Sequence, residues 1–262
     1  MPKSWPSKPF QVSSAAMDRV AYERAAATLH AHWWFTGRAV ILERLLASLA
    51  LPQAARILEI GCGAGANLPV LRAFGSVAAV EQDSFSRDQA RTRHDAEILP
   101  GSLPDDLPFA DRHFDLVCLF DVLEHVERDE DALRAARERL APDGVMIVTV
   151  PAYQWLYSAH DRSSHHLRRY TASKLRHIAG AASLRPVRLG YYNTLLFPLA
   201  AIGRLASRGA GGTGEDPLVL PPALLNRMLH RVFAAESALI GRTFFPYGLS
   251  VIGLFRPTTA SP

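Results

Sequence analysis

The stretch LEIGCGAGANLPVL (58–71) constrains the fold of this chain more than any other segment. It continues the apolar run RILEI (56–60), which is typical of a buried strand, and it ends in the beginning of a helical pattern. The glycines at positions 61, 63 and 65 allow the backbone to approach a ligand without interference from a Cβ atom. The helix that follows offers free N–H groups to the same ligand. A strand, a glycine loop and a helix in this order indicate a nucleotide-type cofactor site in an α/β fold.

The same alternation of strand and helix continues along the chain. Helical patterns occur in DEDALRAARERL (129–140) and in TASKLRHIAGAAS (171–183), where Thr171 is the expected N-cap. The strand-like runs are VAAVE (77–81), AEIL (96–99), FDLVCLF (114–120), VMIVTV (145–150), RPVRLGYY (185–192) and LSVIGLF (249–255). Short apolar strands that alternate with helices predict a parallel sheet covered on both faces.

The sequence patterns divide the chain into four parts. We expect residues 1–14 to form a loose arm and residues 15–54 to form an N-terminal helical lid that is broken near Gly37. Residues 55–192 and 248–257 form the core. Residues 193–247 are a helical insertion with a glycine-rich linker, RGAGGTGEDP (208–217), between an apolar and an amphipathic helix. The insertion is expected to be a cap, a membrane-surface contact or a dimer contact.

Composition excludes several classes of protein. With 262 residues, 48% of them hydrophobic, the chain is expected to form one large domain with accessories. Its net charge of +4 is spread along the chain, which disfavours nucleic acid as a partner. Two cysteines make no disulfide framework, and neither a signal peptide nor a membrane span is recognisable. We therefore expect a cytoplasmic protein whose oligomeric state is open.

Two carboxylates indicate which cofactor the loop binds. Glu81 follows Gly61 by 20 positions, at the end of the second strand, where a carboxylate can accept hydrogen bonds from both ribose hydroxyls. The loop itself also satisfies the NAD fingerprint, with Ala66 in the last position. Glu59, just before the first glycine, suits a cationic ligand better than a pyrophosphate.

The order of the later landmarks resembles one family. PFADRHFDLVCLFDVLEHV (108–126) followed by APDGVMIVTVP (141–151) is similar to the class I S-adenosylmethionine-dependent methyltransferases, particularly the broad group with LEIGCG and DVLEHV. The resemblance covers residues 17–192 and the final strand. It implies a Rossmann-like, doubly wound, seven-stranded sheet with an antiparallel last strand, and S-adenosyl-L-methionine as cofactor. An NAD-dependent dehydrogenase is the alternative.

The resemblance also implies the residues that bind the cofactor. Around the methionine portion it places Glu59, Gly61, Cys62, Gly63 and Gly65, with Phe120 and Asp121 near the amino group. Glu81 would bind the ribose and Gln82 would flank the adenine. Many relatives have a Gly-Asp-Ala element that contacts the adenine amino group, and here Ser102 and Leu103 stand in its place.

Two segments contain candidates for the methyl-transfer chemistry. If the attacking atom belongs to a hydroxyl, a general base helps, and histidine is the usual choice. In PAYQWLYSAHDRSSHHLRRYT (151–171), His160 with Asp161 is our first choice for an orientable base, and His125 is the second. The expected substrate contacts are His166, Arg169 and Tyr170, together with Trp33, Trp34 and Arg38 of the lid.

The motif Asp121-Val-Leu-Glu124-His125 has three interpretations. Glu124 and His125 buttress the loop, His125 acts as a base, or all three residues bind a divalent metal ion. The last resembles the Glu-x-x-Glu-His metal site of small-RNA 2′-O-methyltransferases and some quinone O-methyltransferases. Among these residues, the predicted site includes His125 as a base and Asp121 as a cofactor contact, and it includes no metal ligand.

The acceptor that we expect is a small or lipid-like hydrophobic molecule methylated on oxygen, such as a phenol, quinol precursor, polyketide or isoprenoid. Two other functions stay open. One is a metal-assisted RNA 2′-O-methyltransferase, and the other is a non-catalytic partner that binds the cofactor without turnover.

Overall fold

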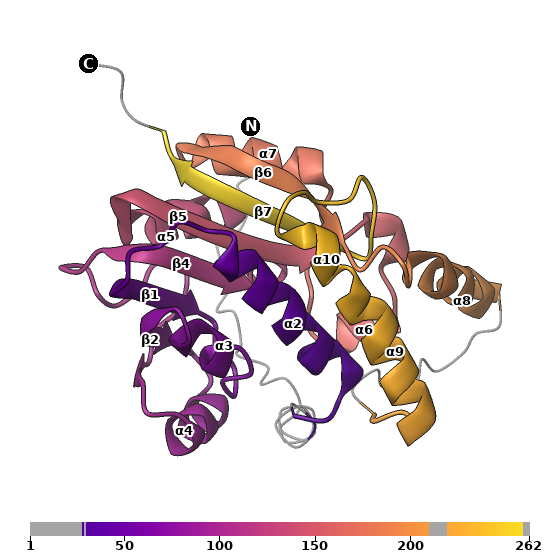
Figure 1. The fold of residues 1–262 in the computed structure, drawn as a ribbon. Helices are drawn as coiled ribbons and strands as arrows, with labels where there is room; N and C mark the ends of the chain where they lie inside the picture. The colour runs from indigo at the N-terminus through magenta and orange to yellow at the C-terminus, as the bar shows by residue number, and fades with distance from the viewer. Residues whose placement is uncertain (1–27, 29, 210–218, 259–262) are drawn as a thin grey trace, which may run out of the picture.

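A computed structural model describes residue 28, residues 30–209 and residues 219–258 (Figure 1). The arm expected at residues 1–14, the first part of the lid at residues 15–27 and most of the glycine-rich linker lie outside these ranges.

The centre of the molecule is a single seven-stranded sheet. Its strands are β1 (Ala55–Ile60), β2 (Gly75–Val80), β3 (Glu97–Leu99), β4 (Phe114–Phe120), β5 (Leu140–Pro151), β6 (Leu184–Tyr192) and β7 (Ser250–Pro257). They lie in the order β3-β2-β1-β4-β5-β7-β6, and β7 is antiparallel to both β5 and β6. The doubly wound sheet with an antiparallel last strand is therefore confirmed.

One of the described helices precedes β1, and the others lie in the connections between the strands. They are α2 (Trp33–Ala47), α3 (Leu68–Arg72), α4 (Ser84–Arg93), α5 (Asp129–Glu138), α6 (Ala159–Ser163), α7 (Ala172–Ala181), α8 (Phe197–Gly209), α9 (Ala223–Ala235) and α10 (Ser237–Ile240), with 3₁₀ turns η1 (Leu123–His125) and η2 (Gln154–Leu156). Thr171 caps α7 as expected, because its side chain accepts a hydrogen bond from the Lys174 amide. The sequence analysis missed α4, whose polar residues show no apolar stripe; the Asp83 side chain caps it.

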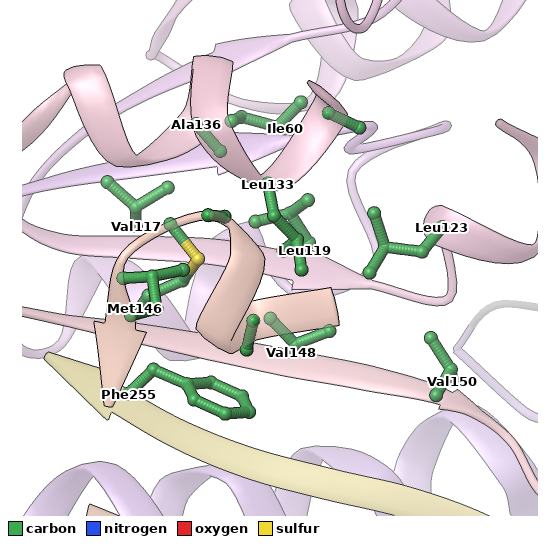
Figure 2. Close-up of a cluster of buried hydrophobic side chains, with 14 of the residues drawn as sticks. Ile60, Val117, Leu119, Leu123, Leu133, Ala136, Met146, Val148, Val150 and Phe255 are labelled. Atoms are coloured by element: carbon green, nitrogen blue, oxygen red, sulfur yellow. The ribbon is translucent and has the colours of Figure 1, made fainter. Parts of the chain in front are cut away.

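Each face of the sheet is covered by a hydrophobic core. On one face, residues such as Leu119 and Val148 pack against Leu133 and Ala136 of α5 (Figure 2). On the other face, Ile41 and other residues of α2 pack against β1, β4, β5 and β7, together with residues of α9 and α10. In this second layer α2 lies beside α9 and α10 (Figure 1). Two covered faces explain why the central strands are almost continuously apolar.

The expected break of the lid near Gly37 is wrong, because α2 runs through this position without interruption. A Cβ atom at Gly37 would lie 2.6 Å from Cδ1 of Phe233 in α9. The glycine is there because two helices pack closely, and its helix-weakening tendency is overridden by that contact. The lid and the insertion are therefore packed together although they are far apart in sequence.

The topology brings the motif loops to one edge of the sheet. The chain leaves β1 toward β2 on one side, and β4 lies on the other side of β1, so the strand order reverses between β1 and β4. Ligands of doubly wound sheets bind outside the carboxyl ends of the strands at such a reversal. Among the described residues, no helix is long and apolar enough to cross a membrane.

Candidate functional site

The glycine loop after β1 has the backbone conformation that its sequence predicts. Gly61, Gly63 and Gly65 have φ angles of +76°, +54° and +88°, which favour glycine. A Cβ atom at Gly61 would lie 2.6 Å from the side chain of Val122, and one at Gly65 would lie 2.6 Å from His94. A Cβ atom at Gly63 would have no neighbour within 4 Å. The loop is thus packed at both ends and open at its centre, where a ligand can approach the backbone.

Glu59 is a fully buried carboxyl group beside this loop. Its Oε1 accepts a hydrogen bond of 2.7 Å from the Asn67 amide, whereas its Oε2 is buried without a hydrogen-bond partner among the described residues. Burial raises the pKa of Glu59 to about 7, against the opposing effects of Asn67 and Arg38. A cationic ligand would stabilise the ionised form, so this residue fits the S-adenosylmethionine that the sequence implies.

Glu81 lies directly after β2 and connects two segments of the site. Its Oε2 accepts a hydrogen bond of 2.7 Å from the Gly63 amide, and its Oε1 accepts one of 2.8 Å from the Asp83 amide. The carboxylate is therefore held against the glycine loop, where a ribose-binding acid must be.

The expected adenine contacts follow neighbouring strands at the same edge. Gln82 is exposed next to Glu81, and Ser102 follows β3. Ser102 pairs with Asp106 through two backbone hydrogen bonds, of 2.8 and 3.1 Å, which fix the loop containing Leu103. Their role toward adenine stays a prediction.

The Cys62 side chain is buried in the glycine loop, and burial raises the pKa of its thiol. The residue therefore remains a neutral thiol at physiological pH and serves the loop through packing.

The end of β4 shows a contact that the sequence did not predict. Phe120 is buried, and Asp121 follows it with a φ angle of +58°. The Asp121 carboxylate accepts hydrogen bonds from Arg38 at 2.6 Å and from the Thr149 hydroxyl at 3.1 Å. Arg38 is thus paired with Asp121, and its expected contact with a substrate stays a prediction.

The expected pairing of Asp161 with His160 is wrong. Asp161 instead binds His166 Nδ1 at 2.9 Å and Arg169 through two nitrogens, at 2.7 and 3.1 Å. Burial alone raises the pKa of Asp161, but the hydrogen bonds from His166 and Arg169 outweigh it and hold the pKa below its usual range. The cause is the short helix α6, where the Asp161 carboxylate accepts a hydrogen bond from the backbone amide of the N-cap residue Ser158.

Two expected substrate contacts are structural residues. The Arg169 guanidinium is buried between Asp161 and the backbone oxygen of Ala152. Tyr170 is fully buried, and its hydroxyl donates to the Leu123 carbonyl and to Asp129. Neither side chain can reach a ligand without breaking these contacts, because their polar atoms are already satisfied inside the protein.

The tryptophans of the lid also serve packing. Trp34 stacks on Phe233 with ring centroids 5.2 Å apart and on Tyr192 at 6.4 Å. Trp33 contacts Phe233 edge to face at 5.7 Å. Their rings join α2 to β6 and to the insertion, and a contact with substrate stays a prediction.

Three histidines, His125, His160 and His166, form what we call the histidine group. The ring centroids of His125 and His166 are 4.8 Å apart, and those of His160 and His166 are 5.9 Å apart. Burial and the neighbouring His166 lower the pKa values of His125 and His160 to about 4. Both imidazoles are therefore neutral at pH 7 and have a nitrogen that can accept a proton.

Sequence analysis missed Asn67 and Thr149, which hold the carboxylates of Glu59 and Asp121. Asn67 lies two residues after Gly65, at the start of α3, so its distance from the loop in the sequence could have identified it. Thr149 offers no such signal, because only the pairing of β4 with β5 brings it beside Asp121.

The pKa of Glu59 leads to a testable prediction. We expect the affinity for S-adenosylmethionine to rise with pH up to about 7 and then level off, because the cation favours the ionised carboxylate. At pH 7 binding should release about half a proton, which titration calorimetry in buffers of different ionisation enthalpy measures.

The Glu59→Gln variant is the matched control, because it keeps the shape and the hydrogen-bond acceptor for Asn67. The ligand's own titration contributes equally to the proton release by both proteins. The difference in proton release between them therefore reports on Glu59 alone. Equal proton release by the two proteins would contradict this assignment.

Comparison with known families identifies a methyltransferase domain over residues 32–189. A probable S-adenosylmethionine-dependent methyltransferase of Mycobacterium tuberculosis is 28% identical over 122 residues, covering 46% of this chain and 43% of that protein. The trans-aconitate 2-methyltransferase of Variovorax paradoxus is 30% identical over 168 residues, covering 61% of this chain and 62% of that enzyme. The match thus spans only about half of the length of these curated relatives.

Solved structures show the same fold at low sequence identity. The CcbJ methyltransferase of Streptomyces caelestis matches with a TM-score of 0.55 and 17% identity, over 85% of this chain and 90% of that chain. A second match is a chain from the complex between the Haloferax volcanii Trm112 methyltransferase activator and a methyltransferase. Its TM-score is 0.59 at 16% identity, and the match covers 92% of this chain and 97% of that chain. At this level of sequence identity, the two matches show that the overall fold is shared.

Proposed function

The chain belongs to the S-adenosylmethionine-dependent methyltransferase family, whose domain matches residues 32–189, and we propose that it methylates an oxygen atom of a small hydrophobic acceptor. When bound, S-adenosylmethionine supplies the electrophilic methyl group. The protein must then hold the acceptor oxygen in line and exclude water. The observation that carries an oxygen acceptor is the histidine group at the edge of the sheet, because a neutral imidazole there can take a hydroxyl proton.

Within this group His160 is the proposed general base. Its ring is half-buried and neutral at pH 7, and it lies next to His166 without an ion pair to Asp161. Asp161 acts as a positioning residue, because it orients His166 and through it the ring of His160. His125, whose ring also lies next to His166, is the second candidate for the base.

A hydrophobic acceptor is supported by an aromatic cluster that follows β5. Tyr153 stacks on Trp155 at 5.9 Å and contacts Phe197 edge to face at 5.7 Å. Phe197 in turn contacts Tyr247 at 5.6 Å. These rings come from the loop before α6, the beginning of α8 and the segment before β7, so the insertion and the histidine-bearing segment share one apolar cluster.

The insertion is therefore proposed to be a cap over the acceptor. Arg204 of α8 donates a hydrogen bond to the backbone oxygen of Leu156, three residues before the start of α6. Exposed apolar side chains continue along α8, with Leu199 and Ile202 both 66% exposed. A planar phenol or an isoprenoid suits such a surface. The name of one relative, trans-aconitate 2-methyltransferase, gives a small molecule as that enzyme's methyl acceptor.

Methyl-labelled S-adenosylmethionine, incubated with the protein and an extract of the source cells, tests the acceptor class. We expect label in the organic phase after partition. Label that remains in the aqueous or nucleic-acid fraction would overturn the hydrophobic acceptor, and absence of transfer to any fraction would overturn catalysis itself.

The His160→Asn variant tests the base. We expect kcat to fall by about 100-fold or more, with unchanged affinity for S-adenosylmethionine, because general-base catalysis contributes factors of this size. His177→Asn, at an exposed position on α7, is the control and should behave like the unmodified protein. Equal kcat values for His160→Asn and the control would exclude His160 as the base.

A further inference from the structure

Glu124 is a buried acidic residue in the part of the chain that the structure describes, and it is not explained by the contacts given so far. The residue is fully buried in the turn η1, and neither carboxylate oxygen has a hydrogen-bond partner among the residues that the structure describes. Buried carboxyl groups are normally hydrogen-bonded, paired with a cation or bound to a metal. The methyl-transfer roles assigned above do not use this residue.

Two imidazoles lie next to this carboxylate. One ligand atom each of Glu124, His125 and His166 can be chosen so that all three lie within 4.8 Å of one another. Glu124 and His125 are neighbours in η1, whereas His166 comes from the segment after α6. The juxtaposition therefore joins two loops at the edge of the sheet, and Asp121, which the sequence placed in this cluster, is bound to Arg38 instead.

The orientation of His166 is set by a further contact. Its Nδ1 lies 2.9 Å from Asp161 Oδ1, and that carboxylate is itself held by Arg169. A carboxylate partner makes Nδ1 the donor, so the lone pair of the ring is on Nε2. Histidines that ligate metal ions are commonly oriented in this way by a carboxylate.

We propose that Glu124, His125 and His166 bind one divalent first-row transition-metal ion. One carboxylate and two imidazoles are a donor set that suits iron, manganese, cobalt or zinc, and they leave coordination positions open. The ion would satisfy the two unpartnered oxygens of Glu124, which no described protein group does.

A metal at this place would have a definite use, and that use rests on the proposed function. An acceptor hydroxyl in an open coordination position would be polarised, and its pKa would be lowered, close to the proposed base His160. The binding of the ion itself does not depend on the acceptor, so the two proposals can fail separately.

Cobalt binding to the untagged, metal-stripped full chain tests the site. We expect one Co²⁺ per chain, with the visible d–d absorption of a nitrogen–oxygen site, and displacement by Zn²⁺. Glu124→Gln and His166→Gln should each weaken Co²⁺ binding by about 10-fold or more, whereas His177→Gln on the exposed face of α7 should not.

Affinity for S-adenosylmethionine and the melting temperature, measured without metal, establish that each variant is folded. If one of the two variants does not fold, His125→Gln replaces it. Equal Co²⁺ affinity in Glu124→Gln and His177→Gln, or less than one ion per chain in the unmodified protein, overturns the metal site. Co²⁺ binding without methyl transfer to any acceptor overturns the proposed function and leaves the site standing.

Discussion

Replacing Glu81 with alanine is expected to weaken S-adenosylmethionine binding by at least about 100-fold. A hydrogen bond to an ionised group contributes about 1.5–3 kcal/mol, and an acid in this position can accept two from the ribose. The substitution also releases the amide of Gly63, which Glu81 holds at 2.7 Å, and thereby loosens the open centre of the glycine loop. The loss in affinity therefore combines missing contacts with a less ordered loop.

Titration calorimetry with S-adenosylmethionine measures this effect. Glu97→Ala removes a half-exposed carboxylate at the start of β3 and serves as the control, since it should leave binding unchanged. Glu81→Asp keeps the charge but shortens its reach, so we expect an affinity between those of the alanine variant and the unmodified protein. Binding by Glu81→Ala that matches Glu97→Ala would place the ribose elsewhere.

Replacing Asp161 with alanine is expected to lower the free energy of unfolding by about 3–5 kcal/mol. Asp161 and Arg169 form a buried ion pair, with side chains 0% and 4% exposed. Removal of one partner leaves the other as an uncompensated charge in the interior, and that is the largest cost of breaking such a pair. The loss of the hydrogen bonds to His166 and to the Ser158 amide adds to it.

Urea unfolding of matched variants measures this cost. Asp105→Ala breaks an ion pair with Arg128 in which both side chains are more than half exposed, so we expect a change below about 1 kcal/mol. Equal effects of the two substitutions would mean that the Asp161 pair is solvated in solution.

The pH dependence gives a second readout for the same pair. The folded pKa of Asp161 is lowered, so the stability that its ionised form contributes is present above the usual value of 3.8 and is lost as the pH falls further. The difference in unfolding free energy between Asp161→Ala and the unmodified protein should therefore narrow below pH 3.8.

Local patterns were enough to predict the sheet. FDLVCLF (114–120) is found as β4 with the same bounds, because a strand buried on both faces is almost continuously apolar. The positive φ angles of Gly61, Gly63 and Gly65 follow from a residue type that alone adopts them without strain. The acids Glu59 and Glu81 were recognisable because their spacing from the loop follows from strand length.

The same reasoning failed where a residue's partner comes from a distant segment. Gly37 was taken as a helix break, but it makes room for Phe233, almost 200 positions further along the chain. Arg169 and Tyr170 carry polar atoms typical of a ligand site, and only the packing of the loop after β5 shows that these atoms are bound internally.

By itself, the sequence determined the strands, the glycine loop and the acids around it, since these depend on periodicity and on backbone conformations within a few residues. Only the tertiary structure decided which histidine Asp161 orients and that His166 joins Glu124 and His125. Such choices depend on how two loops meet at the edge of the sheet. A side chain forms a hydrogen bond with whichever partner the packing brings within about 3 Å, whether or not that partner is close in sequence.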